Sequence, residues 1–188
     1  MRKVILYFNM SLDGIVTNIE NWIKISDELI EDSAKRYEEI DTILFGGNTY
    51  PSMGEYWQNA EDNSDSPTEK SFAKLINDKK KYVISRKKMN LTWRNSEQIL
   101  FIDSKSLIEQ IQNLKNQNGK NISVESGVKT WQFFFENKLY DELWLCLQPI
   151  VAGNGEKIFY DGFPKLEMKL KDTTQYQDGV IKLIYERI

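Results

Sequence analysis

Two turns that contain glycine are the part of this chain best suited to chemistry. Glu125-Ser126-Gly127 follows the β-branched run 121–124 and precedes an aromatic-rich helical stretch, and residues 45–49, Phe-Gly-Gly-Asn-Thr, make a second junction of this kind. A helix start presents N–H groups without intrahelical partners and the positive end of the helix dipole, so it suits a phosphate group. Either turn alone fits a plain tight connection. Two of them in one small chain indicate a dinucleotide.

Charged side chains follow two further expected strands. Ser85-Arg86-Lys87-Lys88 comes after the run 81–85, and Asp13 follows a near-continuous apolar run at 3–8. In an open α/β sheet, ligands gather at the carboxyl ends of the strands, so the cations could hold a ribose phosphate and Asp13 could hydrogen-bond a heterocycle. The structural alternatives are a solvated basic turn and an Asx-turn before Gly14.

Three more residues have both a functional and a structural interpretation. Glu125 is a charged residue at the end of a buried strand, where it needs a partner or a purpose. Trp22 lies in an expected loop, where it either covers a flat ligand or packs against the protein. Asp27 stands in the first turn of an expected helix, where a carboxylate opposes the positive end of the helix dipole.

The chain contains no histidine and a single cysteine, Cys146. A disulfide within the chain is therefore excluded. A zinc site is almost excluded as well, because its usual ligands are missing, and we expect no metal. Catalysis by serine–histidine or cysteine–histidine pairs needs an imidazole group, which this chain lacks. Proton movement would have to use carboxylates, tyrosine, lysine or water.

The bulk composition is that of an ordinary globular protein. The chain has 188 residues, of which 40% are hydrophobic and 28% charged, so we expect one domain over residues 1–188. The net charge of -3 argues against nucleic acid or an anionic membrane as the main partner, and no apolar run is long enough to span a bilayer. The basic and apolar start at 1–8 ends at Asn9 without a cleavage site, so it indicates a strand in a cytoplasmic protein.

The pattern of apolar residues predicts an α/β fold. The expected strands are 3–8, 42–45, 81–85, 99–102, 121–124, 142–147, 167–170 and 180–185, and the expected helices are 26–40, 68–76, 104–116 and 128–137. Residues 50–56 look short and irregular, and 61–67 look like an acidic polar loop. Strands that alternate with helices indicate parallel pairing through helical crossovers. The tail has no helix pattern, so it predicts an antiparallel hairpin.

A set of motifs occurs in order along the chain and resembles a known family. The motifs are Ser-Leu-Asp-Gly at 11–14, Trp-Ile at 22–23, Asp-Thr-Ile-Leu-Phe-Gly at 41–46 with Thr-Tyr at 49–50, Val-Ile-Ser-Arg at 83–86, Val-Glu-Ser-Gly at 124–127, Leu-Tyr-Asp-Glu-Leu at 139–143, Pro-Ile-Val-Ala-Gly at 149–153, and Gly155 with Phe159. The set resembles the dihydrofolate-reductase-like superfamily. Within it, the chain is most similar to the reductase domain of riboflavin biosynthesis and its stand-alone relatives.

The resemblance implies a three-layer fold, with a twisted, mostly parallel sheet between helices. It implies NADPH lying across the strand ends, hydride transfer to a C=N or C=O of a pteridine- or pyrimidine-like heterocycle, and a homodimer formed through 141–149 and the tail. Asp13 and Glu125 would border the nicotinamide as catalytic residues, and Trp22 and Asp27 would border the substrate. The implied cofactor-binding residues are Gly14, Gly46, Gly47, Asn48, Thr49, Ser85, Arg86, Lys87, Ser126, Gly127, Val128 and Lys129.

The chain departs from the family pattern at several positions. Gly47 stands where the family usually has a basic residue, and Ser126-Gly127 replaces a glycine pair. The lack of a basic residue at Gly47 disfavours the phosphorylated cofactor, whereas Arg86 favours it. NADH therefore remains an alternative to NADPH as the cofactor. Residues 51–57 show no phosphoribosyl-binding segment, and Trp22 with Asp27 only loosely resembles the folate enzymes. The alternatives are a nucleotide- or ligand-binding protein without efficient turnover and a dimeric structural protein with an empty cleft.

Overall fold

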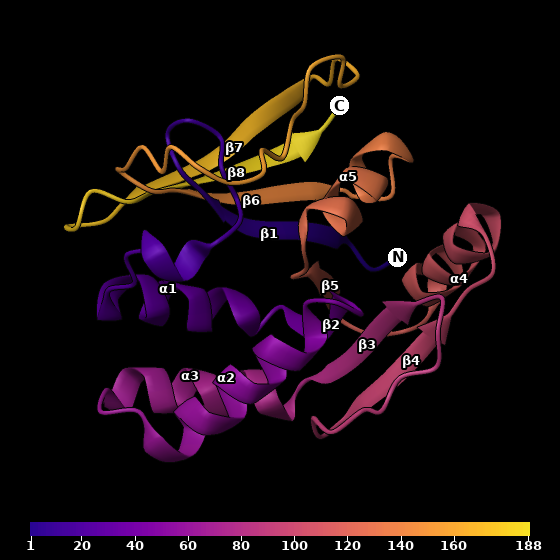
Figure 1. Ribbon diagram of the computed structural model, residues 1–188, viewed down its shortest axis with the longest axis horizontal. Coiled ribbons are helices and arrows are strands. Elements are labelled where there is room, and N and C mark those ends of the chain that lie inside the picture. The colour runs from indigo at the N-terminus through magenta and orange to yellow at the C-terminus, as the bar shows by residue number, and fades with distance from the viewer.

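One eight-stranded sheet organises the computed structural model, which describes residues 1–188 (Figure 1). The strands are β1 (Val4–Met10), β2 (Ile40–Gly46), β3 (Lys80–Ser85), β4 (Ser96–Leu100), β5 (Asn121–Val124), β6 (Glu142–Leu147), β7 (Met168–Gln175) and β8 (Ile181–Arg187). The helices are α1 (Asp27–Tyr37), α2 (Tyr50–Asn63), α3 (Pro67–Asp78), α4 (Ser104–Asn116) and α5 (Val128–Glu136), with a short 3-10 turn at Ile19–Asn21. None of these helices has the length and apolar character needed to cross a membrane.

The strand order is β4-β3-β2-β5-β1-β6-β8-β7, and the first six strands in this order are parallel. β8 pairs antiparallel with β6, and β7 pairs antiparallel with β8, so the expected hairpin of the tail is confirmed. Alternate strand residues face opposite sides of a sheet. Accordingly Leu6 and Val124 pack with α4 and α5, whereas Ile5 and Ile43 pack with α1, α2 and α3. The three-layer α/β fold is therefore confirmed.

Three helix starts are fixed by side-chain caps. The hydroxyl of Ser26 accepts a hydrogen bond from the N–H of Leu29 at 3.3 Å, as expected for the start of α1. Ser66 caps α3 in the same way, and Asp103 forms a capping box with Ser106 at α4. α1 ends at Tyr37 rather than at residue 40, because Ile40 already belongs to β2.

The prediction for residues 50–56 was wrong. They form the first half of α2, a helix of 14 residues that also takes in the start of the expected polar loop at 61–67. Pro51 and Gly54 look like helix breakers, but proline is compatible with the first helical turn. A Cβ atom on Gly54 would lie 3.2 Å from the ring of Trp93, so this glycine lets the helix pack closely on the indole. A tertiary contact thus overrides the local propensity.

The carboxyl edge of the sheet has a step in the middle. Val124, the last residue of β5, is in register with Leu6 of β1 and Leu44 of β2. β1 then continues to Met10 and β2 to Gly46, so both neighbours extend beyond β5. In open α/β sheets, ligands bind outside the carboxyl ends of strands where the chain changes direction across the sheet. We call this place the step above β5.

Lys81 of β3 holds the end of α3 to the sheet. Its side chain is buried, and Nζ donates hydrogen bonds to the carbonyls of Ile76 at 3.2 Å, Asn77 at 2.7 Å and Lys79 at 2.8 Å. Burial lowers the pKa of this ammonium group to about 7. Methionine fills a similar volume but has no donor, so it would leave three carbonyls of a helix end unpaired.

We therefore expect Lys81→Met to lower the free energy of unfolding by about 2 to 3 kcal/mol. The neighbouring variant Lys80→Met is the matched control, because Lys80 forms a partly exposed ion pair with Glu97. It should change stability by less than about 1 kcal/mol. Urea unfolding of both variants measures the difference, and equal stabilities would contradict this role of Lys81.

Candidate functional site

The two glycine turns meet at the carboxyl ends of β2 and β5. The N–H of Gly46 donates a hydrogen bond to the hydroxyl of Ser126 at 2.7 Å. On the other side of the same contact, a Cβ atom on Gly127 would lie 3.1 Å from the hydroxyl oxygen of Thr49. Residues 46–49 and 126–129 therefore form one continuous surface, which we call the turn pair.

Close approach explains the glycines of the turn pair. A Cβ atom on Gly46 would lie 2.7 Å from Oγ of Ser126 and 2.8 Å from Oγ1 of Thr130. A Cβ atom on Gly47 would lie 2.9 Å from the sulfur of Met89. None of the glycines in the turn pair has a positive φ, so they serve packing rather than turn conformation. Met89 fills the space in which a basic side chain at position 47 would start.

The helices that begin at the turn pair lack side-chain caps. α2 follows Thr49 and α5 follows Gly127, and neither of these two residues makes a side-chain capping hydrogen bond. The other three α-helices each have such a cap. The first N–H groups of a helix have no intrahelical acceptor. The N–H groups of Gly46, Gly47 and Thr49 already donate within the protein, so the expected positions Asn48 and Val128 are the ones left to bind an anion at these positive helix ends.

A fixed turn beside the turn pair carries three cationic side chains, of which Arg86 lies over the ring of Phe101 at 5.4 Å from its centroid. Oγ of Ser85 accepts from the N–H of Lys87 at 3.1 Å and donates to its carbonyl at 2.9 Å, and the amide group of Gln98 donates to the same carbonyl at 2.6 Å. The side chains of Arg86, Lys87 and Lys88 are exposed, and none forms a salt bridge. This turn can attract a second anionic group.

Asp13 joins two loops at the ends of β1 and β6. Its carboxylate accepts hydrogen bonds from Oγ of Ser11 at 2.6 Å and from the N–H groups of Ala152 at 3.0 Å and Gly153 at 2.9 Å. These donors lower the pKa of Asp13 to about 2. Gly14 follows with φ +84°, which favours glycine. Both carboxylate oxygens accept a hydrogen bond from the loop that follows β6, so Asp13 holds this loop against the end of β1.

Glu125 lies in a different environment. It is buried, its Oε1 accepts hydrogen bonds from the hydroxyls of Tyr37 and of Ser123, the latter at 2.9 Å, and it forms no salt bridge. Burial raises the pKa of Glu125 to about 7, although both hydroxyls act in the opposite direction. A carboxyl group with such a pKa can both hold and release a proton at neutral pH.

Trp22 and Asp27, expected to border the substrate, have structural partners. Trp22 is buried, and its indole N–H donates to the carbonyl of Thr17 at 3.0 Å, so its ring packs in the protein. Asp27 accepts a hydrogen bond from Ser66, the cap of α3, at 3.0 Å and so links α1 with α3. Neither side chain forms a hydrogen bond with the turn pair.

Two residues of the site carry no local signal in the sequence. Tyr37 reaches Glu125 from a position 88 residues earlier in the chain. Gln148 is fully buried. Its Oε1 accepts a hydrogen bond from the N–H of Lys24 and its Nε2 donates one to Oδ1 of Asn9, both at 3.0 Å. These bonds hold the loop before α1 against the end of β1. A lone tyrosine in a helix and a lone glutamine after a strand are too common in proteins to indicate a functional site.

Comparison with known proteins identifies similar chains. A family model described as the RibD C-terminal domain matches residues 2–182. The uncharacterized protein YyaP of Bacillus subtilis (strain 168) is 30% identical over 188 residues, which cover 98% of this chain and 94% of YyaP.

Two solved structures share the fold at low sequence identity. RibD of Acinetobacter baumannii superposes with a TM-score of 0.71 at 17% identity, over 100% of this chain and 58% of RibD. The diaminohydroxyphosphoribosylaminopyrimidine deaminase/5-amino-6-(5-phosphoribosylamino)uracil reductase of Thermotoga maritima gives 0.68 at 16% identity, over 100% of this chain and 57% of that protein. This chain therefore corresponds to slightly more than half of each of these two proteins.

Proposed function

Because this chain belongs to the family of RibD C-terminal domains, we propose that it is an NADPH-dependent reductase of a small pyrimidine- or pteridine-like heterocycle. We also propose that residues 1–188 form one domain. The observation that carries it is the contact between the two glycine turns, where Gly46 bonds Ser126 and Gly127 abuts Thr49. The two turns of the pair are close enough to bind a single pyrophosphate together.

The residues present fit the cofactor. A side chain on Gly46 or Gly127 would push against the facing turn, and both adjoining helix starts lack caps. The pyrophosphate would be held by the turn pair, with the hydroxyl of Thr49 and the ammonium of Lys129 beside it. Ser85, Arg86 and Lys87 would hold a phosphate on the ribose. When bound, NADPH supplies the hydride, and the protein positions it.

Reduction of the substrate needs a proton as well as the hydride, and we assign delivery of this proton to Glu125. Its pKa near 7 lets it carry a proton at neutral pH, and it lies at the step above β5. The pKa of Asp13, about 2, keeps that carboxylate ionised, and both its oxygens accept hydrogen bonds from residues 152 and 153. We therefore assign proton delivery to Glu125 and loop positioning to Asp13.

Turnover is the direct test of this function. Purified protein should bind NADPH, seen as a shift in its thermal midpoint, and should oxidise it in the presence of at least one member of a panel of dihydropteridines and oxidised pyrimidines. Absence of any binding at millimolar NADPH would exclude the reductase.

A nucleotide-binding protein without turnover is the second candidate. It is favoured by Gly47 and Ser126, the two positions at which the turns depart from the family pattern. This candidate predicts NADPH binding without oxidation across the whole panel. Steady oxidation with any one compound would exclude it.

The side chains of Arg86 and Lys87 should make the protein bind NADPH more tightly than NADH. Removing both charges in Arg86→Ala/Lys87→Ala should weaken NADPH binding by about 10- to 100-fold, because charge-assisted hydrogen bonds contribute about 1.5 to 3 kcal/mol. NADH lacks the ribose phosphate, so its affinity should change by no more than about twofold. Fluorescence titration measures both cofactors.

The charge-matched control for this double variant is Lys165→Ala/Lys169→Ala, because these exposed lysines form ion pairs with Glu167 and Glu186. It should leave both affinities unchanged. An equal loss for NADPH and NADH in the Arg86 and Lys87 variant would place these cations elsewhere on the cofactor or away from it.

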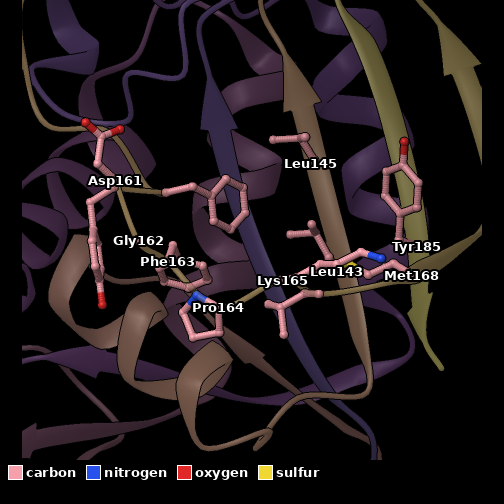
Figure 2. A pocket seen from close by; sticks show the side chains of 12 residues that line it. Leu143, Leu145, Asp161, Gly162, Phe163, Pro164, Lys165, Met168 and Tyr185 are labelled. Atoms are coloured by element: carbon pink, nitrogen blue, oxygen red, sulfur yellow. The ribbon is translucent and has the colours of Figure 1, made fainter.

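We further propose that the protein forms a homodimer through β6 and the tail. On this side of the sheet, Leu143, Tyr185 and Leu170 lie in register across β6, β8 and β7. Beside them is a largely apolar groove of about 700 Å³ under the segment 159–166 (Figure 2). Leu170 is 51% exposed. A second copy would cover this apolar surface, which a stable dimer of about 800 Å² per partner needs.

Leu170→Glu should then halve the mass measured by light scattering, because it places a charge in the covered face. Ile102→Glu is the control, since Ile102 is 90% exposed in the connection between β4 and α4, far from this face. It should leave the mass unchanged. A monomeric parent protein would contradict the proposed dimer.

A further inference from the structure

Glu125 has hydroxyl neighbours but no cation. Tyr37 from α1 and Ser123 from β5 contact its carboxyl group, and the ring of Tyr7 from β1 lies next to Tyr37 at 6.3 Å between centroids. Behind Tyr7 lies Cys146 of β6, whose sulfur is 3.9 Å from the hydroxyl of Tyr7, and Lys182 of β8, which is in register with Cys146, is paired with Asp32. A buried charged carboxylate normally needs a cation or several donors. The surroundings of Glu125 therefore suit a group that is neutral for part of its working cycle.

The two oxygens of this carboxyl group are not equivalent. Oε1 accepts both hydroxyl hydrogen bonds, from Tyr37 and from Ser123 at 2.9 Å. Oε2 makes no hydrogen bond with the protein. It is nevertheless not fully buried, because it retains some contact with solvent. Oε2 is therefore the oxygen open to another molecule.

A hydroxyl hydrogen bond uses a lone pair of the oxygen that accepts it. With two donors on Oε1, a proton that joins the carboxyl group is directed to the other oxygen. We propose that Tyr37 and Ser123 are positioning residues, whose hydroxyls occupy Oε1 and so direct the exchangeable proton of Glu125 to Oε2. The inference rests on the proposed function only in giving that proton to the substrate.

Tyr37 is held firmly enough for this task. Its side chain is 1% exposed, and its ring makes edge-to-face contact with Phe72 of α3 at 5.3 Å. The N–H of Glu125 donates to the carbonyl of Leu44 at 3.0 Å, which fixes the backbone from β2. Both partners are thus fixed before any ligand arrives, which is what positioning requires.

The experiment is a titration of Glu125 in the protein alone. Carbon-13 NMR of protein labelled at the glutamate carboxyl carbon follows each glutamate, and Glu125→Gln identifies the signal. In Tyr37→Phe the ring packing remains but the donor to the charged form is lost. We expect the midpoint to rise by about one pH unit, and Ser123→Ala to move it in the same direction.

Tyr140→Phe is the matched control. Tyr140 is equally buried, lies on the opposite face of the sheet with α5, and its hydroxyl makes no hydrogen bond with the protein. It should leave the midpoint of Glu125 unchanged. An unchanged or lowered midpoint in Tyr37→Phe would overturn the inference, as would a midpoint for the parent protein at the ordinary value for glutamate.

A second readout separates positioning from a purely structural role. If Tyr37 only stabilised the fold, Tyr37→Phe would lower the unfolding midpoint but leave the pH profile of NADPH oxidation in place. We expect the profile to shift upwards with the NMR midpoint. The titration needs neither cofactor nor substrate, so failure of NADPH to bind would remove the proposed function and leave the outcome for Tyr37 and Ser123 readable.

Discussion

Gly46→Ala should lower the affinity for NADPH by about 100-fold or more, while the protein stays folded. The new methyl group would lie 2.7 Å from Oγ of Ser126 and 2.8 Å from Oγ1 of Thr130. Both are short side chains, so the two strand ends must move apart to admit it. The hydrogen bond from the Gly46 N–H to Ser126 would lengthen, and the turns would no longer bind one pyrophosphate together.

Gly162→Ala is the matched control for this variant. A Cβ atom at Gly162 meets nothing within 4 Å, but φ there is +88°, so alanine costs about 1 kcal/mol of backbone strain far from the turn pair. It should lower the thermal midpoint slightly and leave NADPH binding unchanged. Isothermal titration of both variants gives the comparison, and Gly46→Ala binding NADPH nearly as well as the parent would contradict the shared anion site.

Glu125→Gln should lower turnover of NADPH by about 100-fold or more, because a positioned general acid contributes about 10²- to 10⁴-fold. Glutamine keeps the size of the side chain but has no proton to give at this position. NADPH affinity should change little, since Glu125 is not assigned to the cofactor phosphates. Steady-state kinetics with the substrate found in the panel measures the effect, and full activity in Glu125→Gln would assign the proton to water or another residue.

The same substitution should also change how stability depends on pH. In the unfolded chain glutamate titrates near its ordinary value of 4.5, whereas burial raises the pKa of Glu125 to about 7 in the folded protein. Between these values the folded state retains a proton that the unfolded chain has released. Stability therefore falls as pH rises through this window, by at most about 3 kcal/mol at 1.36 kcal/mol per unit.

Glu125→Gln lacks this titration. Its stability relative to the parent should therefore rise between pH 4.5 and pH 8 and stay constant above. Urea unfolding at several pH values measures both proteins, and the other titrating groups cancel in the difference. Parallel pH curves would contradict the raised pKa.

Much of the fold was predictable because the local signals and the tertiary structure agree. The apolar runs at 3–8 and 42–45 became β1 and β2, and the Ser26 cap marks the start of α1 as expected. The first half of α2 was missed because the contact between Gly54 and Trp93 joins residues 39 positions apart. Local patterns cannot report such a contact.

Part of the candidate site was also predictable from local signals, and part was not. The sequence indicated both turns, because glycine beside a β-branched run is a local signal, and the structure brings them together through pairing of β2 with β5. The partner of Glu125 was not predictable, because Tyr37 reaches it only when α1 packs on the sheet. Asp13 is a mixed case, because its bond with Ser11 is local, whereas its bonds with the N–H groups of Ala152 and Gly153 join residues 139 and 140 positions apart.

The most direct test of the central claim is an NMR titration of ¹⁵N-labelled protein with NADPH, which follows backbone N–H signals of both turns. We expect the signals of Gly47, Asn48 and Thr49 and those of Gly127, Val128 and Lys129 to shift together along one saturation curve. Shifts confined to one of the two turns, or to neither, would show that these turns do not bind a common pyrophosphate.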